Sequence, residues 1–177
     1  MPKKLLKATL WIAIICFTGL MLIYKPSLRI TSLKTIFGYA GQAVSLTGIL
    51  LALYTKWLWR INPVDKTPRF KSNYHVIMTS SYDGKDYDGE IKIRQDLLSV
   101  HVTLITNESQ SASISSTIVT RDAVPTLVYS YCNLPNTDLR YRSPIHYGTV
   151  KLELNDMNHL IGEYYTDRKT YGTIRWH

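Results

Sequence analysis

The chain has 177 residues, enough for one modest domain and a membrane anchor, and its formal net charge is +8. Such a charge would suit a nucleic-acid-binding protein, but residues 1–71 hold 11 Lys and Arg against one acidic residue, whereas residues 72–177 hold 10 against 12. Because the basic excess lies beside the apolar part of the chain, we expect anionic lipid as its partner and exclude DNA and RNA.

Two uncharged apolar stretches near the N-terminus predict a hairpin of two membrane-spanning helices. Residues 8–24 and 35–55 are 17 and 21 residues long. These lengths give helices of roughly 26 and 32 Å against a hydrocarbon core of roughly 30 Å, and flanking lysines can make up the difference in the first. A signal peptide followed by one span is the alternative, but no small-x-small cleavage site is evident. We therefore expect a two-helix anchor over residues 1–58.

Basic residues around the hairpin predict its orientation. Eight Lys and Arg stand on the side of the two chain ends, and three stand in the connection at 25–34. Because an excess of positive charge marks the cytoplasmic side, we expect both termini in the cytoplasm.

The second stretch carries small residues at spacings of three and four, which places them on one helical face. They are Gly41, Ser45, Gly48 and Ala52, and Gln42 lies near mid-bilayer on a neighbouring face. Small residues let membrane helices approach closely, and a buried amide needs a hydrogen-bond partner. Two interpretations stay open: this face packs against the first helix, or it packs against other copies so that the anchor oligomerises.

An all-β domain is predicted over residues 71–177, after a linker with prolines and basic residues at 59–70. Apolar and polar residues alternate with a period of two, as in half-buried strands. The expected strands cover residues 73–80, 90–94, 101–106, 112–120, 126–132, 150–154, 160–167 and 171–176.

Turn-forming pairs separate these strands and indicate the fold class. They are Asp83-Gly84, Asp88-Gly89, Asn107-Glu108, Pro135-Asn136 and Asn155-Asp156. About eight short strands favour a small closed antiparallel β-barrel over a two-sheet sandwich, because closure removes exposed strand edges. A barrel of this size has room for one small ligand at its mouth.

Two groups of basic residues in the β domain are candidate phosphate ligands. They are Arg140 and Arg142, on either side of Tyr141 in a segment taken as extended, and Arg168, Lys169 and Arg175 in the last hairpin. Guanidinium groups bind phosphate in a bidentate manner and aromatic rings stack on bases, so the pattern indicates a nucleotide pocket. The alternative is ordinary surface charge, paired with Asp138 or Asp167.

The sequence contains no recognisable catalytic or metal-binding motif. Its five histidines lack metal-ligand spacing, and G-x-S-x-G, P-loop and C-x-x-C motifs are absent. The acidic stretch at 83–90 fails the calcium-loop pattern because Lys85 stands in its third position, so we interpret it as two turns. Cys16 and Cys132 fall in different kinds of segment and predict no disulfide. We expect neither enzymatic activity nor a cofactor.

The closing residues 162–176, GEYYTDRKTYGTIRW, follow the pattern G-x-Y-x-T-x-R-x-T-x-G. The matching positions are Gly162, Tyr164, Thr166, Arg168, Thr170 and Gly172. Together with two N-terminal spans and a small β domain, this pattern resembles the two-transmembrane, β-strand-rich effectors of bacterial CBASS antiphage systems. The resemblance implies that the cytoplasmic barrel binds a cyclic dinucleotide made by a phage-activated nucleotidyltransferase. It also implies that ligand-bound copies assemble through their membrane helices and disrupt the inner membrane, which leads to abortive infection.

Candidate ligand contacts follow from this resemblance. We expect Arg168 and Arg142 to contact phosphate, with Arg140 as a further candidate, and the pocket to be lined by Tyr164, Thr166 and Tyr171. Two rival hypotheses stay open. One is a membrane-anchored, lipocalin-like carrier or sensor of an apolar molecule, which predicts an apolar barrel interior. The other is an interaction subunit or an enzyme of unrecognised type.

Overall fold

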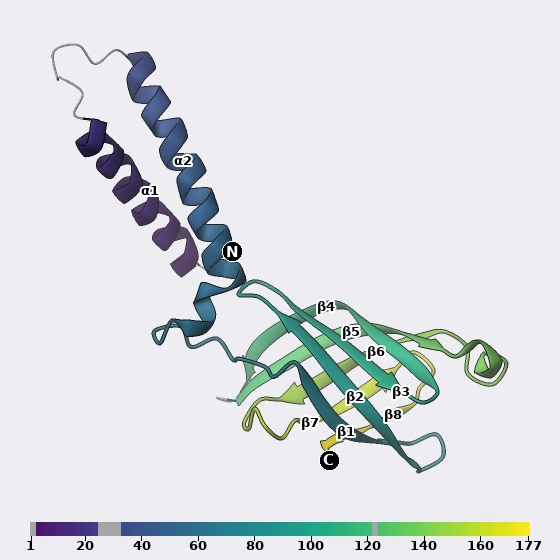
Figure 1. Ribbon diagram of the computed structural model, residues 1–177. Helices are drawn as coiled ribbons and strands as arrows, with labels where there is room; N and C mark the ends of the chain where they lie inside the picture. The colour runs from purple at the N-terminus through teal and green to yellow at the C-terminus, as the bar shows by residue number, and fades with distance from the viewer. Residues whose placement is uncertain (1–2, 25–32, 122–123) are drawn as a thin grey trace. The chain divides into compact units, whose positions relative to one another are not determined.

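The computed structural model describes residues 3–24, 33–121 and 124–177. The chain divides into two compact units, Met1–Asp65 and Lys66–His177. The first unit is helical and the second is built of strands (Figure 1).

The helical unit contains α1 (Lys3–Tyr24), α2 (Leu33–Lys56) and a short 3₁₀ helix, η1 (Leu58–Ile61). Helices α1 and α2 pack side by side and run in opposite directions (Figure 1). Helix α2 is long and apolar enough to cross a membrane, whereas the apolar part of α1, Thr9–Tyr24, is shorter. An apolar helix of this kind indicates membrane association. The expected basic connection lies mostly outside the described residues, at 25–32.

The face of α2 that is buried is not the face that carries the small residues. Ala43 and Thr47, one helical turn apart, are both buried, and the Thr47 hydroxyl donates to the Ala43 carbonyl at 2.7 Å. The predicted small-residue face lies about half a turn away, and its side chains are exposed. Its members are Gly41, Ser45, Gly48 and Ala52, with Gln42 beside them also exposed.

Eight antiparallel strands close into a barrel in chain order, which confirms the predicted fold class. The strands are β1 (Asn73–Ser80), β2 (Asp86–Gln95), β3 (Val100–Thr106), β4 (Ser109–Arg121), β5 (Val124–Pro135), β6 (His146–Glu153), β7 (Ile161–Thr166) and β8 (Tyr171–Trp176). Pairing of β8 with β1, from Val76 opposite Trp176 to Ser80 opposite Gly172, closes the ring.

Alternation along each strand decides which side chains fill the barrel. Alternate residues such as Val76, Ile91, Leu127, Leu152 and Ile174 are almost fully buried and form one apolar core. Consecutive antiparallel strands bring every second connection to the same end. The connections at 81–85, 107–108, 136–145 and 167–170 therefore meet at one end, which we call the barrel mouth.

The turn predicted at Asp88-Gly89 is wrong. Both residues lie inside β2, where Asp88 pairs with Ile77 and Gly89 pairs with Val76 on one side and Thr106 on the other. Strand pairing on both sides outweighs the local preference of Asp-Gly for a hairpin. The turn predicted at Asp83-Gly84 does connect β1 and β2, and Gly84 has a φ of +68° there.

The extended segment predicted at 140–142 is also wrong. A 3₁₀ helix, η2 (Thr137–Leu139), follows β5, and the Arg142 amide donates to the Leu139 carbonyl at 3.1 Å. These short-range hydrogen bonds form a turn, so alternation of faces does not apply to Arg140 and Arg142.

Candidate functional site

A cavity of about 200 Å³ lies at the barrel mouth. Inward side chains of the strands form its floor, and the four connections with the adjoining strand ends form its rim. The floor consists of Met78, Leu104, Tyr129, Tyr131, Val150, Tyr164 and Ile174. The rim is mainly polar and includes Ser80, Tyr82, Tyr87, Thr106, Glu108, Ser109, Arg142, Ser143, His146, Thr166, Arg168 and Thr170.

Two tyrosines of β5, Tyr129 and Tyr131, dominate the floor. Their ring centroids are 6.4 Å apart at an interplanar angle of 57°. Burial raises the pKa of both hydroxyls, so both stay protonated at neutral pH. The Tyr129 hydroxyl is buried and has no hydrogen-bond partner within the described residues. A ligand that reached the floor would meet an unused donor and acceptor.

Two glycines make room for the tyrosine rings. Gly148 lies opposite Tyr131 and Gly172 lies opposite Tyr164 in the strand register. A Cβ atom on Gly148 would come within 2.5 Å of the Tyr131 ring, and one on Gly172 would come within 2.5 Å of the Tyr164 ring and 2.1 Å of the Thr79 carbonyl oxygen. Each ring therefore lies across the backbone of its partner glycine, an arrangement that a larger residue would prevent.

The β7–β8 hairpin explains the spacing of the C-terminal pattern. Tyr164, Thr166, Arg168 and Thr170 all line the cavity. The Thr166 amide donates to the Thr170 carbonyl at 2.9 Å, the Thr170 amide donates to the Thr166 hydroxyl at 3.2 Å, and the two hydroxyl oxygens are 2.6 Å apart. These bonds hold the tight turn, in which Lys169 has a φ of +62°. The turn carries Arg168 to the rim.

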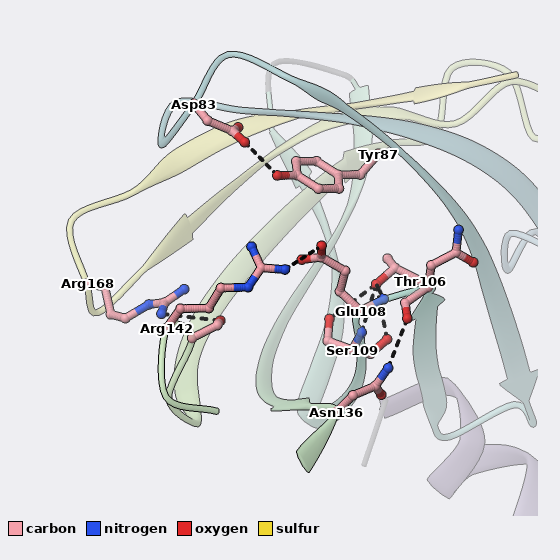
Figure 2. A network of polar contacts seen from close by, with 10 residues as sticks. Asp83, Tyr87, Thr106, Glu108, Ser109, Asn136, Arg142 and Arg168 are labelled. Carbon is pink, nitrogen blue, oxygen red and sulfur yellow. Dashed lines mark hydrogen bonds and ion pairs between the residues drawn. The ribbon is translucent and has the colours of Figure 1, made fainter. Parts of the chain in front are cut away.

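Two of the three predicted arginines lie at the cavity, in different surroundings (Figure 2). Arg142 Nη2 donates to Glu108 Oε1 at 2.8 Å. This hydrogen bond and the charge of Glu108 raise the pKa of Arg142. Arg168 Nη1 lies 3.4 Å from Ser143 Oγ, and no carboxylate of the described chain lies within ion-pair distance of it. The alternative interpretation of these arginines as surface charge predicted Asp138 or Asp167 as their partners. Arg142 is paired, but its partner is Glu108.

Arg140 and Tyr171 do not line the cavity. Arg140 Nε donates to the Pro135 carbonyl at 3.2 Å. Tyr171 is 61% exposed, because its neighbour Gly172 takes the inward position of the strand. The structure therefore brings four predicted residues together, Arg142, Arg168, Tyr164 and Thr166, and leaves these two outside.

Several polar residues of the cavity were not predicted. Asn133 and His146 are buried at the mouth ends of β5 and β6, and Asn133 Oδ1 accepts a hydrogen bond from the Ser111 hydroxyl at 2.8 Å. Burial lowers the pKa of His146, whose Nδ1 lies 3.1 Å from the Pro144 carbonyl. Extending the alternation beyond each apolar run would have found them, because Asn133 lies two residues after Tyr131.

The chemistry of the cavity is that of a receptor for a polar aromatic anion. Three tyrosine rings and four aliphatic side chains form its floor, and its rim carries hydroxyl groups and two guanidinium groups. This mixed lining does not fit the apolar interior of a lipocalin-like carrier. No group of three or more His, Cys, Asp or Glu that could hold a metal occurs within the described residues.

Comparison with known proteins points to one family. A family model described as "Cap15, cyclic dinucleotide receptor domain" matches residues 65–177. CD-NTase-associated protein 15 of Staphylococcus schleiferi is 24% identical over 177 residues, which cover 98% of this chain and 94% of that protein. CD-NTase-associated protein 15 of Yersinia aleksiciae is 30% identical over 142 residues, which cover 74% of this chain and 68% of that protein.

Proposed function

Because this chain belongs to the Cap15 family of cyclic dinucleotide receptors, effectors of CBASS antiphage systems, we propose that the cavity at its barrel mouth binds the cyclic dinucleotide. The observation that carries this proposal is the convergence of two guanidinium groups at the rim and three tyrosine rings at the floor of one cavity. A cyclic dinucleotide supplies the matching groups, two phosphodiesters and two bases. Tyr164 and Thr166 would line the pocket, and Arg168 and Arg142 would contact phosphate.

The size of the cavity suggests how the ligand is held. Pockets that enclose a drug-sized ligand measure roughly 300–1,000 Å³. At about 200 Å³, this cavity is too small to enclose a whole cyclic dinucleotide. We infer that one base enters the barrel and meets Tyr129, Tyr131 and Tyr164, while the phosphates stay at the rim beside the arginines.

We further propose that ligand binding leads to assembly in the bacterial inner membrane. Large apolar side chains such as Leu22, Ile23 and Phe37 are exposed on α1 and α2, as expected for helices surrounded by lipid. The small-residue face of α2 is also exposed and could pack against a second copy. A ligand that favours the assembled state by about 5 kcal/mol would move the population from mostly dispersed to mostly assembled. Disruption of the membrane by this assembly would kill the infected cell.

The proposed topology is multi-pass, with both termini in the cytoplasm. It rests on the excess of Lys and Arg on the side of the chain ends. It also agrees with the proposed ligand, because the barrel must face the compartment in which the nucleotide is made. Two of the opposing charges, Lys25 and Arg29, lie outside the described residues.

Calorimetric titration of the full-length protein in lipid nanodiscs tests the proposed ligand class. The titrants are cyclic di-AMP, cyclic di-GMP and cyclic GMP–AMP, each compared with its linear form. We expect saturable binding of one cyclic ligand per barrel and weaker binding of its linear form, which carries the same bases without the closed ring. Absence of binding across this panel would contradict the proposal.

A further inference from the structure

Glu108 is an acidic residue at a rim that is otherwise suited to anions. It lies in the short connection between β3 and β4 and lines the cavity. Its backbone is fixed from both sides, because its amide donates to the Thr106 hydroxyl at 3.3 Å and its carbonyl accepts from the Asn136 amide at 2.9 Å. The carboxylate is therefore held at the rim by the fold of the connection (Figure 2).

The carboxylate of Glu108 forms a hydrogen-bonded ion pair with the guanidinium group of Arg142. Nη2 of Arg142 and Oε1 of Glu108 are 2.8 Å apart, and the two side chains are 48% and 43% exposed. Carboxylate and phosphate use the same donors of a guanidinium fork, so both cannot take the same N–H groups. Arg168 contacts Ser143, the residue after Arg142, and no carboxylate of the described chain. Within the described residues, Arg168 is thus free of carboxylate contacts, whereas Arg142 is partly occupied by Glu108 through Nη2.

We propose that Glu108 is a built-in competitor for the ligand phosphate at Arg142 and that it sets the ligand concentration at which the receptor responds. This inference rests on the proposed function of the cavity. A ligand phosphate that approaches Arg168 meets a pre-positioned cation. A phosphate that approaches Arg142 must first displace Glu108 and then share the rim with its negative charge.

Displacement is feasible because the pair is half-exposed and connects two separate loops. Ion pairs in such surroundings are weak, since water competes for both partners, so a phosphate can replace the carboxylate without unfolding the connection. The displaced carboxylate keeps its charge near the phosphate and lowers the affinity. A ligand that presents two phosphates at the required separation engages both arginines, whereas an anion with one phosphate binds at Arg168 alone.

The test compares wild type, Glu108→Gln and the double variant Glu108→Gln/Arg142→Gln, together with Arg142→Gln. All are full-length in nanodiscs and are titrated with the member of the cyclic dinucleotide panel that wild type binds best. We expect Glu108→Gln to bind roughly fivefold more tightly at low salt, with a smaller gain at high salt. On the Arg142→Gln background the same substitution should bring a much smaller gain.

Glu90→Gln is the matched control. Glu90 pairs with Lys92 at 3.2 Å on β2 and does not line the cavity, so this variant removes the same charge without altering the rim. Its affinity should equal that of wild type. Thermal unfolding checks that each variant folds, and Glu108→Ala replaces Glu108→Gln if the amide disturbs the connection.

The outcomes separate the two proposals. Unchanged or weaker binding by Glu108→Gln, with wild type still binding, overturns the competitor role and leaves the proposed function intact. An equal gain in affinity by Glu90→Gln would show that the effect comes from overall charge, and it would also overturn the competitor role of Glu108. Absence of binding by both wild type and Glu108→Gln overturns both proposals.

Discussion

Two polar side chains of the cavity lack strong partners within the described residues. The Tyr129 hydroxyl is buried without a hydrogen bond, and Arg168 contacts a serine hydroxyl and no carboxylate. A buried hydroxyl without a partner costs about 1–3 kcal/mol of folding free energy. A binding site commonly retains such groups because the ligand later satisfies them.

Tyr129→Phe should therefore stabilise the barrel without ligand by about 1 kcal/mol and weaken ligand binding. Tyr74→Phe is the control, because the Tyr74 hydroxyl accepts from the Lys71 amide and donates to the Met157 carbonyl, each at 2.9 Å. This control should lose stability. Urea unfolding and ligand titration of both variants check the prediction, and equal destabilisation of the two would contradict it.

His146 should make the stability of the barrel depend on pH. Burial lowers its pKa in the folded state below the ordinary value of 6.5. The unfolded chain therefore binds a proton more readily than the folded one, so the free energy of unfolding is greatest above about pH 6.5 and falls as the pH drops through the folded pKa. The pKa values of Asp83, Asp96 and Asp156 are also lowered, but these carboxyl groups change the free energy of unfolding only nearer pH 4.

The prediction for His146 is tested by His146→Gln, which should flatten the dependence of stability on pH between about pH 7 and 5. His75→Gln, at an exposed position of β1, should keep the wild-type slope. Unfolding curves at several pH values measure both. If wild type and His146→Gln lost the same stability over this range, another group would be responsible.

At the scale of elements, glycine–tyrosine pairs between neighbouring strands shape the cavity. Gly148 accommodates Tyr131 between β6 and β5, and Gly172 accommodates Tyr164 between β8 and β7. In each pair the glycine gives up side-chain packing, and the tyrosine ring covers the exposed backbone. The rings are thereby fixed at the floor before any ligand arrives.

Gly172→Ala should destabilise the barrel by about 1–3 kcal/mol, because the new methyl group would overlap the Thr79 carbonyl and the Tyr164 ring. Gly89→Ala should cost less, since its nearest contact, at 3.1 Å, is the mobile end of the Leu104 side chain. Urea unfolding ranks the two variants. Equal stability of Gly172→Ala and wild type would show that β8 can shift, contrary to the closed register.

The strands were predictable because alternation continues over most of each one. All eight predicted strands overlap observed ones, and the helices begin and end within a few residues of the predicted ranges, apart from the earlier start of α1 at Lys3. The turn predicted at Asp88-Gly89 was wrong because a local turn preference carries no information about strand pairing on both sides. The extended segment predicted at residues 140–142 was wrong because the alternation was extended into a turn.

The site was half predictable. Tyr164, Thr166 and Arg168 were predicted from the resemblance to a family pattern, and the structure shows that all three line the cavity. Glu108 and Tyr129 were missed because their role depends on connections and strands distant in sequence. The pairing of Ser109 with Pro135, between β4 and β5, brings Glu108 of the β3–β4 connection to within 2.8 Å of Arg142.

At the scale of the whole molecule, the chain joins a receptor barrel to a helical unit with an apolar helix suited to a membrane. In the proposed mechanism the barrel would bind the ligand and α2 would supply the surface for assembly. Substitutions in one unit should therefore separate ligand binding from killing.

Gly48→Leu should leave ligand affinity unchanged and abolish killing, because a bulky side chain on the exposed small-residue face of α2 prevents close helix packing. Gly19→Leu on α1 is the control, since a Cβ atom there likewise meets nothing within 4 Å. Titration and survival of cells that produce the cyclic dinucleotide measure the two effects. Undiminished killing by Gly48→Leu would place assembly on another surface.

The most direct test of the account is the affinity of Arg168→Ala for the cyclic dinucleotide, measured beside Arg175→Ala in the full-length protein. Arg175 lies on the same hairpin but does not line the cavity. Because a charge-assisted hydrogen bond contributes about 1.5–3 kcal/mol, Arg168→Ala should bind at least about tenfold more weakly, with Arg175→Ala close to wild type. Equal affinity of Arg168→Ala and wild type would contradict the placement of the ligand at the barrel mouth.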